Sequence, residues 1–320
     1  MAATLATSLI ERNRTALAKA ITLAESQKKD DQIAFQELLK DVLPHTGKSM
    51  RLGITGAPGV GKSTFIEAFG GFLTEQGKRV AVLSIDPSSP LTKGSILGDK
   101  TRMEKLSKNP MAFIRPSASH NFIGGVAHAT RESILLCEAA GFDVVIIETV
   151  GVGQSEFSVS DMCDCFLLLM LAGAGDELQG IKKGIMEMAD IIAITKADGD
   201  NKKQAQLARA EYQHALHLVR SDDDWAPKVV TCSALENIGI SETWTEITQF
   251  IEHQKNSKQF DLARQQQQAH WLNEQLNYTL RQQLSQQNHF GERWTKAEQQ
   301  VQQNNWTVFQ AVNYIMNPGA

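Results

Sequence analysis

Seven short apolar runs alternate with amphipathic helical segments along most of the chain. Nearly every position in these runs is apolar, which is typical of strands buried on both faces of a parallel sheet. The runs are RLGIT from 51, RVAVLSID from 79, MAFIRP from 111, DVVIIET from 143, CFLLLMLA from 165, DIIAITKAD from 190 and KVVTCSA from 228. The alternation predicts an α/β fold with a mostly parallel sheet, in a central domain of 49–256.

Both ends of the chain lack the strand pattern, so we predict helical extensions there. Residues 1–48 favour two or three helices, and we expect no secretory leader because the segment lacks an apolar core and contains Glu11 and Glu25. The segment 257–320 is rich in glutamine and predicts a helical arm.

A leucine stripe in the C-terminal arm raises the question of subunit contact. Four leucines recur every four residues and lie along one face of a helix: Leu272, Leu276, Leu280 and Leu284. The stripe either packs on the protein's own surface or pairs with a second subunit, and the pattern alone leaves both interpretations open.

The sequence GAPGVGKST connects the first apolar run to a helical segment. It fits the phosphate-loop pattern G-x-x-x-x-G-K-[ST], in which backbone N–H groups and a helix N-terminus hold phosphates. In this pattern Lys62 reaches the β- and γ-phosphates and the Ser63 hydroxyl takes a position on Mg²⁺. The predicted nucleotide-binding residues of the loop are Gly56, Ala57, Pro58, Gly59, Val60, Gly61, Lys62, Ser63 and Thr64.

Three carboxylates follow apolar strands or lie in a glycine-containing loop nearby. Glu148 ends the run DVVIIET, Asp86 ends RVAVLSID, and Asp99 lies in GSILGDKTR. Because ligands of open α/β sheets bind at the carboxyl ends of the strands, we expect these groups to meet at one phosphate edge and serve Mg²⁺ or its water.

The choice of base is indicated by TKAD, residues 195–198, and by the later SAL, residues 233–235. Asp198 can accept from N1–H and the 2-amino group of guanine, whereas adenine leaves this carboxylate unpaired. The Lys196 stem can cover the base, and the loop of Ser233, Ala234 and Leu235 is expected to close over the guanine oxygen. Thr195 stands where asparagine is usual, which predicts the same specificity with a looser grip.

The composition of the chain narrows its possible partners and its cellular environment. The chain has 320 residues, 42% hydrophobic and 21% charged, with a formal net charge of −4, which argues against nonspecific nucleic-acid binding. No apolar run approaches the roughly twenty residues of a membrane span. Cys163 and Cys165 form the only close cysteine pair, without a nearby histidine, so we expect buried thiols in a reducing cytoplasm rather than a zinc site.

Several blocks of the chain resemble the MeaB/ArgK family of P-loop GTPases, which is related to the methylmalonic aciduria type A protein. They are GAPGVGKSTF, SIDPSSPLTKGSILGDKTRM, ETVGVGQSE and GDELQGIKKGIMEMADI. The resemblance implies a P-loop fold of the dimeric SIMIBI class that binds GTP, GDP and Mg²⁺. It places Ser63, Asp86, Asp99 and Glu148 around the metal ion.

The function implied by the resemblance is that of a GTP-hydrolysing chaperone. Such proteins gate cofactor loading and protect an adenosylcobalamin-dependent acyl-CoA mutase, of which methylmalonyl-CoA mutase is the expected partner. The segment 171–182 matches the family's extra switch loop, and Lys182 is the residue there that we expect to act in catalysis. Because Gln154 comes late after the strand end, we expect slow intrinsic turnover that a partner stimulates.

Two other functions remain as alternatives. A small-molecule kinase needs a pocket for the molecule that accepts the phosphate. The guanine-reading segments TKAD and SAL would have no role in an ATP-dependent kinase. A nickel-delivery GTPase usually carries a segment rich in histidine or cysteine, whereas the 8 histidines of this chain are scattered.

Overall fold

The computed structural model describes residues 2–26, 28–85, 103–117, 125–149, 155–173, 183–219, 225–287 and 289–317. Contacts divide the chain into two compact units, Met1–Gln267 and Gln268–Ala320. The long helix α13 (Gln259–Ser285) begins in the first unit and ends in the second. The first part of the predicted C-terminal arm therefore packs with the central domain.

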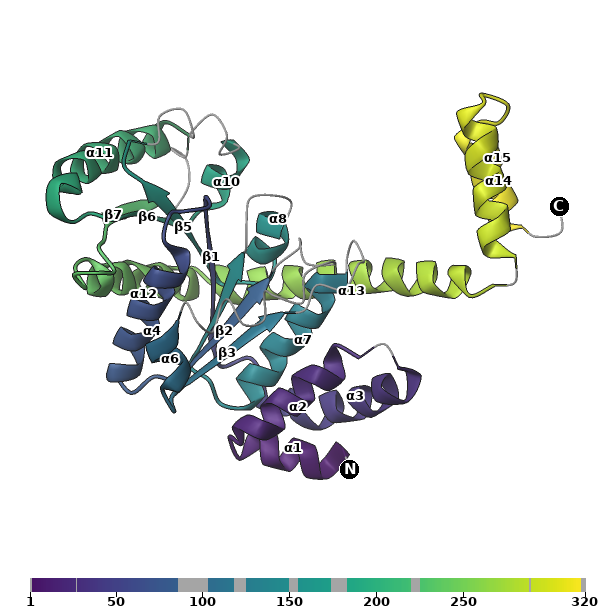
Figure 1. The fold of residues 1–320 in the computed structure, drawn as a ribbon, viewed down its shortest axis with the longest axis horizontal. Coiled ribbons are helices and arrows are strands. Elements are labelled where there is room, and N and C mark those ends of the chain that lie inside the picture. Colours follow the sequence, from purple (N-terminus) through teal and green to yellow (C-terminus); the bar gives the residue numbers. More distant parts are fainter. Residues whose placement is uncertain are drawn as a thin grey trace. The chain divides into compact units, whose positions relative to one another are not determined.

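Within the described residues, the first unit contains a seven-stranded sheet of order β3-β2-β4-β1-β5-β6-β7 (Figure 1), and every neighbouring pair is parallel. The strands are β1 (Met50–Gly56), β2 (Val80–Ile85), β3 (Ala112–Ser117), β4 (Val144–Thr149), β5 (Cys165–Leu171), β6 (Ile191–Thr195) and β7 (Lys228–Thr231). Each strand overlaps one of the seven apolar runs, so the predicted α/β fold is confirmed. Every residue of β2 and β4 is buried, as strands covered on both faces require.

In the described part of the first unit, three helices precede the first strand and the others come after strands. They are α1 (Ala2–Ile10), α2 (Arg14–Ala24), α3 (Lys29–Val42), α4 (Lys62–Glu75), α6 (Glu104–Lys108), α7 (Gly125–Ala139), α8 (Ser155–Ser160), α10 (Lys183–Met188), α11 (Lys202–Val219) and α12 (Ile240–Asn256). Short 3-10 turns, Leu43–His45 and Gly199–Asn201, precede β1 and α11.

The helices cover the sheet on both faces. One core joins α4, α6 and α12 to the strands through side chains such as Phe65, Phe69 and Leu73. A second core joins α7, α8, α10 and α11 to the opposite face. The helices α1, α2 and α3 contact α7 (Figure 1), so the predicted N-terminal helices extend this second layer.

A buried ion network fixes the start of α13 to the first unit. The Arg264 guanidinium donates to both carboxylate oxygens of Asp164 at 2.7 Å and to the Ser49 carbonyl at 2.7 Å. The neighbouring Arg51 donates to Glu138, whose side chain is fully buried. These contacts join the first turns of α13 to residues of the central domain, so these turns belong to the first unit. Removing one member of a buried ion pair would leave an uncompensated charge.

The second unit contains the end of α13 followed by α14 (Phe290–Gln302) and α15 (Val308–Met316), which pack against each other. The start of α15 is fixed by a capping box, in which the Thr307 side chain accepts from the backbone N–H of Gln310.

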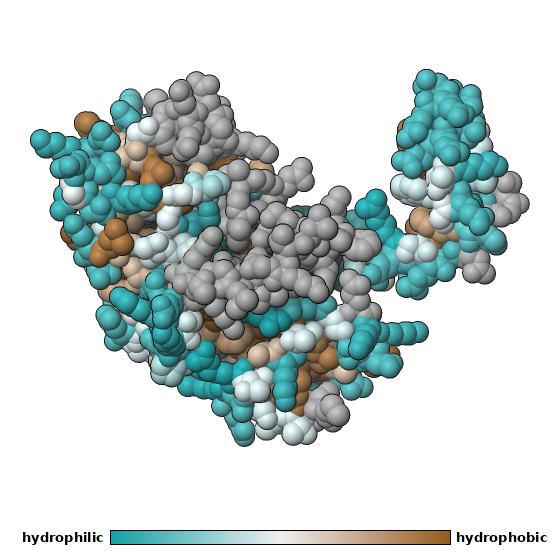
Figure 2. All heavy atoms as spheres, viewed as in Figure 1, coloured by the Kyte–Doolittle hydropathy of each residue, from teal (hydrophilic) through white to brown (hydrophobic). Residues whose placement is uncertain are grey.

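No described helix is long and apolar enough to cross a membrane. On the face shown in Figure 2 the described surface is mostly hydrophilic, with hydrophobic side chains in small separate groups. All four cysteines are free and buried, which confirms the predicted buried thiols, and burial raises the pKa of Cys232 to about 12.

Candidate nucleotide site

The phosphate loop connects β1, a central strand, to the N-terminus of α4. Gly59 and Gly61 have φ values of 82° and 96°, a left-handed region that glycine adopts without strain. At Gly56 a Cβ would come within 2.5 Å of the Leu169 carbonyl, so the chain leaves β1 through a space that only glycine fits. The three glycines of the motif thus shape a turn that directs backbone N–H groups to an anion at the helix N-terminus.

Lys62 begins α4 and reaches back over the loop. Its Nζ donates to the carbonyls of Gly56 at 2.6 Å and Ala57 at 3.3 Å. Burial lowers the pKa of Lys62, and the carboxylates of Glu148 and Glu156 oppose that shift. A partly desolvated ammonium group at a helix N-terminus gains strongly from a bound polyphosphate.

Glu148 lies in β4, beside the phosphate-loop strand, and is paired in register with Ile54 of β1. Its side chain is buried, and the Ser84 hydroxyl donates to its Oε2 at 3.3 Å. Together with the Ser63 hydroxyl at the first turn of α4, it supplies hard oxygen ligands of the kind that Mg²⁺ prefers. The described part of the predicted metal set therefore fits a magnesium ion beside the phosphate loop.

Glu156 is a second carboxylate near the phosphate loop, and no sequence motif indicates it. It lies in the first turn of α8 and is fully buried. It interacts electrostatically with Lys62, as Glu148 does. Its burial depends on how α8 packs against β1 and β4, so the sequence pattern alone carries no signal for it.

The predicted base-reading residues converge on one pocket. A cavity of about 160 Å³ lies between the start of α4, the end of β6 and the loop after β7, and its lining includes Lys196, Asp198, Ala234 and Leu235. The Lys196 Cε lies 3.9 Å from where a Cβ of Gly61 would stand, so the lysine stem crosses the phosphate loop. This placement is suited to a flat base held between apolar surfaces.

Asp198 has a fixed orientation in this pocket. The buried Ser233 hydroxyl donates to its Oδ2 at 2.5 Å, and the Ser233 hydroxyl oxygen accepts from the Glu236 N–H at 3.1 Å. The Lys196 backbone is left-handed, with a φ of 54°, and Asn201 Nδ2 donates to its carbonyl at 2.7 Å. A carboxylate held in this way can accept two parallel hydrogen bonds from one edge of guanine.

Thr195 joins the base-reading segment to the phosphate loop. Its buried hydroxyl lies 2.7 Å from the Val60 carbonyl and 3.2 Å from the Met170 carbonyl, so its single proton serves one acceptor at a time. The structure thus gives a specific contact for the residue that stands where asparagine is usual.

We expect Thr195→Val to weaken GTP binding by about tenfold, because a buried carbonyl left without a donor costs roughly 1–3 kcal/mol. Thr195→Ser keeps the hydroxyl and should bind GTP nearly as the wild type does. Calorimetric titration with GTP measures both variants. Equal affinities for the valine and serine variants would show that the contact with Val60 carries no binding energy.

The remaining predicted residues Asp86, Asp99 and Lys182 lie outside the described residues, as does Gln154. Among the described residues, no three His, Cys, Asp or Glu side chains lie together as a metal site. The structure therefore brings together the phosphate loop, Glu148 and the base-reading residues.

A glycine-rich phosphate loop and an adjoining base pocket at the carboxyl edge of a parallel sheet define a P-loop nucleotide-binding protein. The profile of the family described as "Methylmalonyl Co-A mutase-associated GTPase MeaB" matches residues 17–289. The chain belongs to this family of GTPases, which confirms the resemblance seen in the sequence.

Relatives and a solved structure agree with this assignment. The chain is 53% identical over 277 residues to "GTPase ArgK" of Escherichia coli (strain K12), covering 85% of this chain and 84% of that protein. It is 48% identical over 277 residues to the "Methylmalonic aciduria type A homolog, mitochondrial" of Mus musculus, covering 83% of this chain and 67% of that protein. The crystal structure titled "LAO/AO transport system kinase" matches with a TM-score of 0.79 and 40% identity, covering 98% of this chain and 96% of that one.

Proposed function

We propose that this GTPase is a chaperone for an adenosylcobalamin-dependent acyl-CoA mutase, with methylmalonyl-CoA mutase as its partner. In this proposal GTP hydrolysis gates cofactor loading and protects the mutase from inactivation. The observation that carries it is the joining of a phosphate loop and a guanine-type pocket in a chain of the mutase-associated family.

The chain's own residues divide the chemistry of GTP hydrolysis. The phosphate loop and Lys62 hold the β- and γ-phosphates and neutralise charge as the terminal phosphoryl group leaves. Ser63 and Glu148, with Asp86 and Asp99, would hold Mg²⁺, which would supply positive charge to the phosphates. Lys196, Asp198 and the loop 233–235 select guanine.

Slow intrinsic turnover follows from the same residues. The described part of the site would hold the nucleotide and neutralise the charge of its phosphates. We assign none of the described residues to orient the attacking water. We assign the partner response to 171–182, because this segment follows β5 of the nucleotide sheet. In this proposal Lys182 brings positive charge toward the phosphates when the mutase binds.

The test of this function is GTPase turnover with and without purified methylmalonyl-CoA mutase. We expect the mutase to accelerate wild-type hydrolysis, and Lys182→Ala to retain GTP affinity while losing most of the stimulated rate. Equal stimulation of both proteins would remove Lys182 from the mechanism. An unstimulated wild type that phosphorylates a small molecule would favour a kinase, and tight nickel binding would favour a nickel-delivery GTPase.

A homodimer is part of the proposal. Leu272, Leu276 and Leu280 on α13 are 69%, 53% and 47% exposed, and Leu284 is half-buried. An exposed apolar stripe of this kind is satisfied by burial against a second subunit.

We expect Leu276→Glu combined with Leu280→Glu to convert a dimer into a monomer, because burying an unpaired carboxylate costs several kcal/mol. The matched control is Gln275→Glu with Gln282→Glu, which adds the same charge on another face of α13. Light scattering after size exclusion gives the masses. A wild-type monomer, or a dimeric leucine variant, would contradict the assignment.

A further inference from the structure

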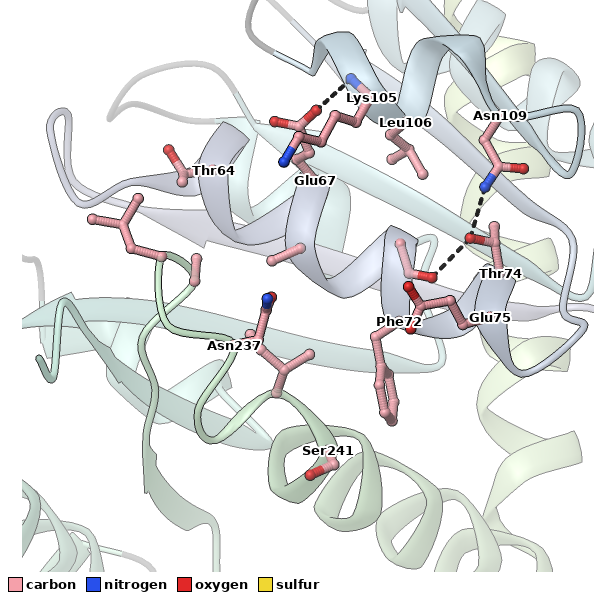
Figure 3. A pocket seen from close by; sticks show the side chains of 15 residues that line it. Thr64, Glu67, Phe72, Thr74, Glu75, Lys105, Leu106, Asn109, Asn237 and Ser241 are labelled. Carbon is pink, nitrogen blue, oxygen red and sulfur yellow. Dashed lines mark hydrogen bonds between the residues drawn. The ribbon is translucent and has the colours of Figure 1, made fainter.

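A groove runs along α4 beside the base pocket, and nucleotide binding gives it no role. Its volume is about 610 Å³, and it is lined by α4, α6 and the segment 234–241. Figure 3 shows Thr64 and Glu75 toward opposite ends of α4, Lys105 and Asn109 on one side, and Asn237 and Ser241 on the other. From Thr64 to Glu75 the helix rises about 16 Å, the length of an extended segment of about five residues.

The groove is preformed, because three contacts fix α6 to α4. The backbone N–H of Lys105 donates to Glu67 at 2.7 Å, and Asn109 Nδ2 donates to the Thr74 hydroxyl at 2.9 Å. Between these bonds Leu106 packs on Gly70, where an added Cβ would come within 2.6 Å of the leucine side chain. A rigid wall of this kind presents its surface without an ordering cost on binding.

The floor of the groove is open. A Cβ on Gly71 would meet no atom within 4 Å among the described residues, and Gly71 lines the groove beside Ala68. Small residues at the floor let another backbone approach α4 closely. The half-buried Phe72 and the 78% exposed Leu235 add apolar surface at the sides.

The charges of the groove favour a cation at one end. Glu75 is exposed in the last turn of α4, where the partial negative charge of the helix C-terminus adds to its own. Glu67 contributes a second carboxylate, and Lys105 alone contributes an ammonium among the lining residues. An incoming lysine or arginine therefore finds its best position beside Glu75, while a phosphate group is repelled there.

The other end of the groove adjoins the nucleotide. Thr64, Ala234 and Leu235 line both the groove and the base pocket. A segment seated in the groove would therefore cover the open side of the base pocket. Binding at one site then changes affinity at the other by the same factor in both directions.

We propose that this groove docks a short, extended, basic segment of the partner protein and that its occupancy slows nucleotide release. The identity of the partner, the mutase, rests on the proposed function. The charge of the α4 C-terminus, the open floor at Gly71 and the shared lining with the base pocket support this occupant.

The experiment measures two quantities for each variant: affinity for purified methylmalonyl-CoA mutase, and the rate of GDP release with and without it. Glu75→Lys opposes a basic segment and Gly71→Phe fills the floor. Each should lower mutase affinity by at least about tenfold and remove the mutase effect on GDP release. Basal GDP release should stay at the wild-type value, because neither residue lines the base pocket.

Two matched variants control for charge and folding. Glu37→Lys makes the same charge change on the exposed surface of α3, and Gly71→Ala adds only a methyl group at a helical site. Both should behave as the wild type. A photo-crosslinker at Asn237 should label a mutase peptide that contains lysine or arginine.

The outcomes separate the two proposals. If the wild type binds the mutase and the Glu75 and Gly71 variants bind it equally well, the groove proposal is wrong and the chaperone function stands. A crosslink from Asn237 to a second copy of this chain would also overturn the groove proposal. A wild type that does not bind the mutase overturns both.

Discussion

Lys62→Ala is expected to reduce GTP hydrolysis by about 10²–10³-fold or more and to weaken GTP binding. The Lys62 ammonium donates to the Gly56 carbonyl at 2.6 Å, so it lies over the loop that we expect to hold the β- and γ-phosphates. Burial lowers the pKa of Lys62, because desolvation disfavours the charged form of its ammonium group. The triphosphate supplies an opposing charge, and charge that develops during phosphoryl transfer adds to the gain.

The control for this prediction is Lys48→Ala, which removes an exposed lysine just before β1. Turnover at saturating GTP and binding of a non-hydrolysable GTP analogue are measured for both variants. Near-normal turnover in Lys62→Ala would remove the phosphate loop from the mechanism.

The sheet and its ligand edge follow from local pattern in this chain. Each of the seven apolar runs forms a strand, because continuous apolar sequence between helices is stable only where both faces of a strand are covered. The phosphate loop and the position of Glu148 follow from the same rule, since a residue at a strand's carboxyl end reaches the ligand edge of a parallel sheet.

Features that depend on packing between distant segments were not predictable. The burial of Glu156 requires α8 to lie against β1 and β4, and the groove along α4 requires α6 to seat Leu106 on Gly70. The Arg264 and Asp164 pair joins residues 100 positions apart, so no periodicity predicts that the first turns of α13 return to the central domain. Local sequence determines which segments form helices and strands, whereas these contacts depend on how the segments meet.

The role of Thr195 lies between these cases. Its place in TKAD predicted a role in reading the base. Because asparagine is usual at this position, the sequence predicted the same specificity with weaker binding of the nucleotide. The structure shows why threonine is accommodated: the end of β6 approaches the phosphate loop closely enough for a short side chain to reach the Val60 carbonyl at 2.7 Å. The distance between two loops, which sequence does not give, decides whether the shorter side chain can form the contact.

Asp198→Asn should move nucleotide preference from guanine toward xanthine. In the assignment made above, the Asp198 carboxylate would accept from N1–H and the 2-amino group of guanine. Ser233 holds the carboxylate in place with a hydrogen bond of 2.5 Å to Oδ2. The asparagine amide keeps one acceptor and gains a donor. It therefore faces the guanine amino group with a donor of its own, but it matches the carbonyl at C2 of xanthine.

A mismatched complex leaves buried polar groups unpaired, so we expect the affinity for GTP to fall and the affinity for XTP to rise. The ratio of the two affinities should change by several orders of magnitude. The orienting contact survives the change, since the Ser233 hydroxyl can still donate to the amide oxygen. The control is Asp200→Asn, an exposed carboxylate two residues further on, which should leave both affinities unchanged. Competition binding with GTP, XTP and ATP measures the three proteins side by side. A wild type that prefers ATP, or an Asp198 variant that retains its GTP affinity, would refute the assignment of Asp198 as the residue that reads guanine.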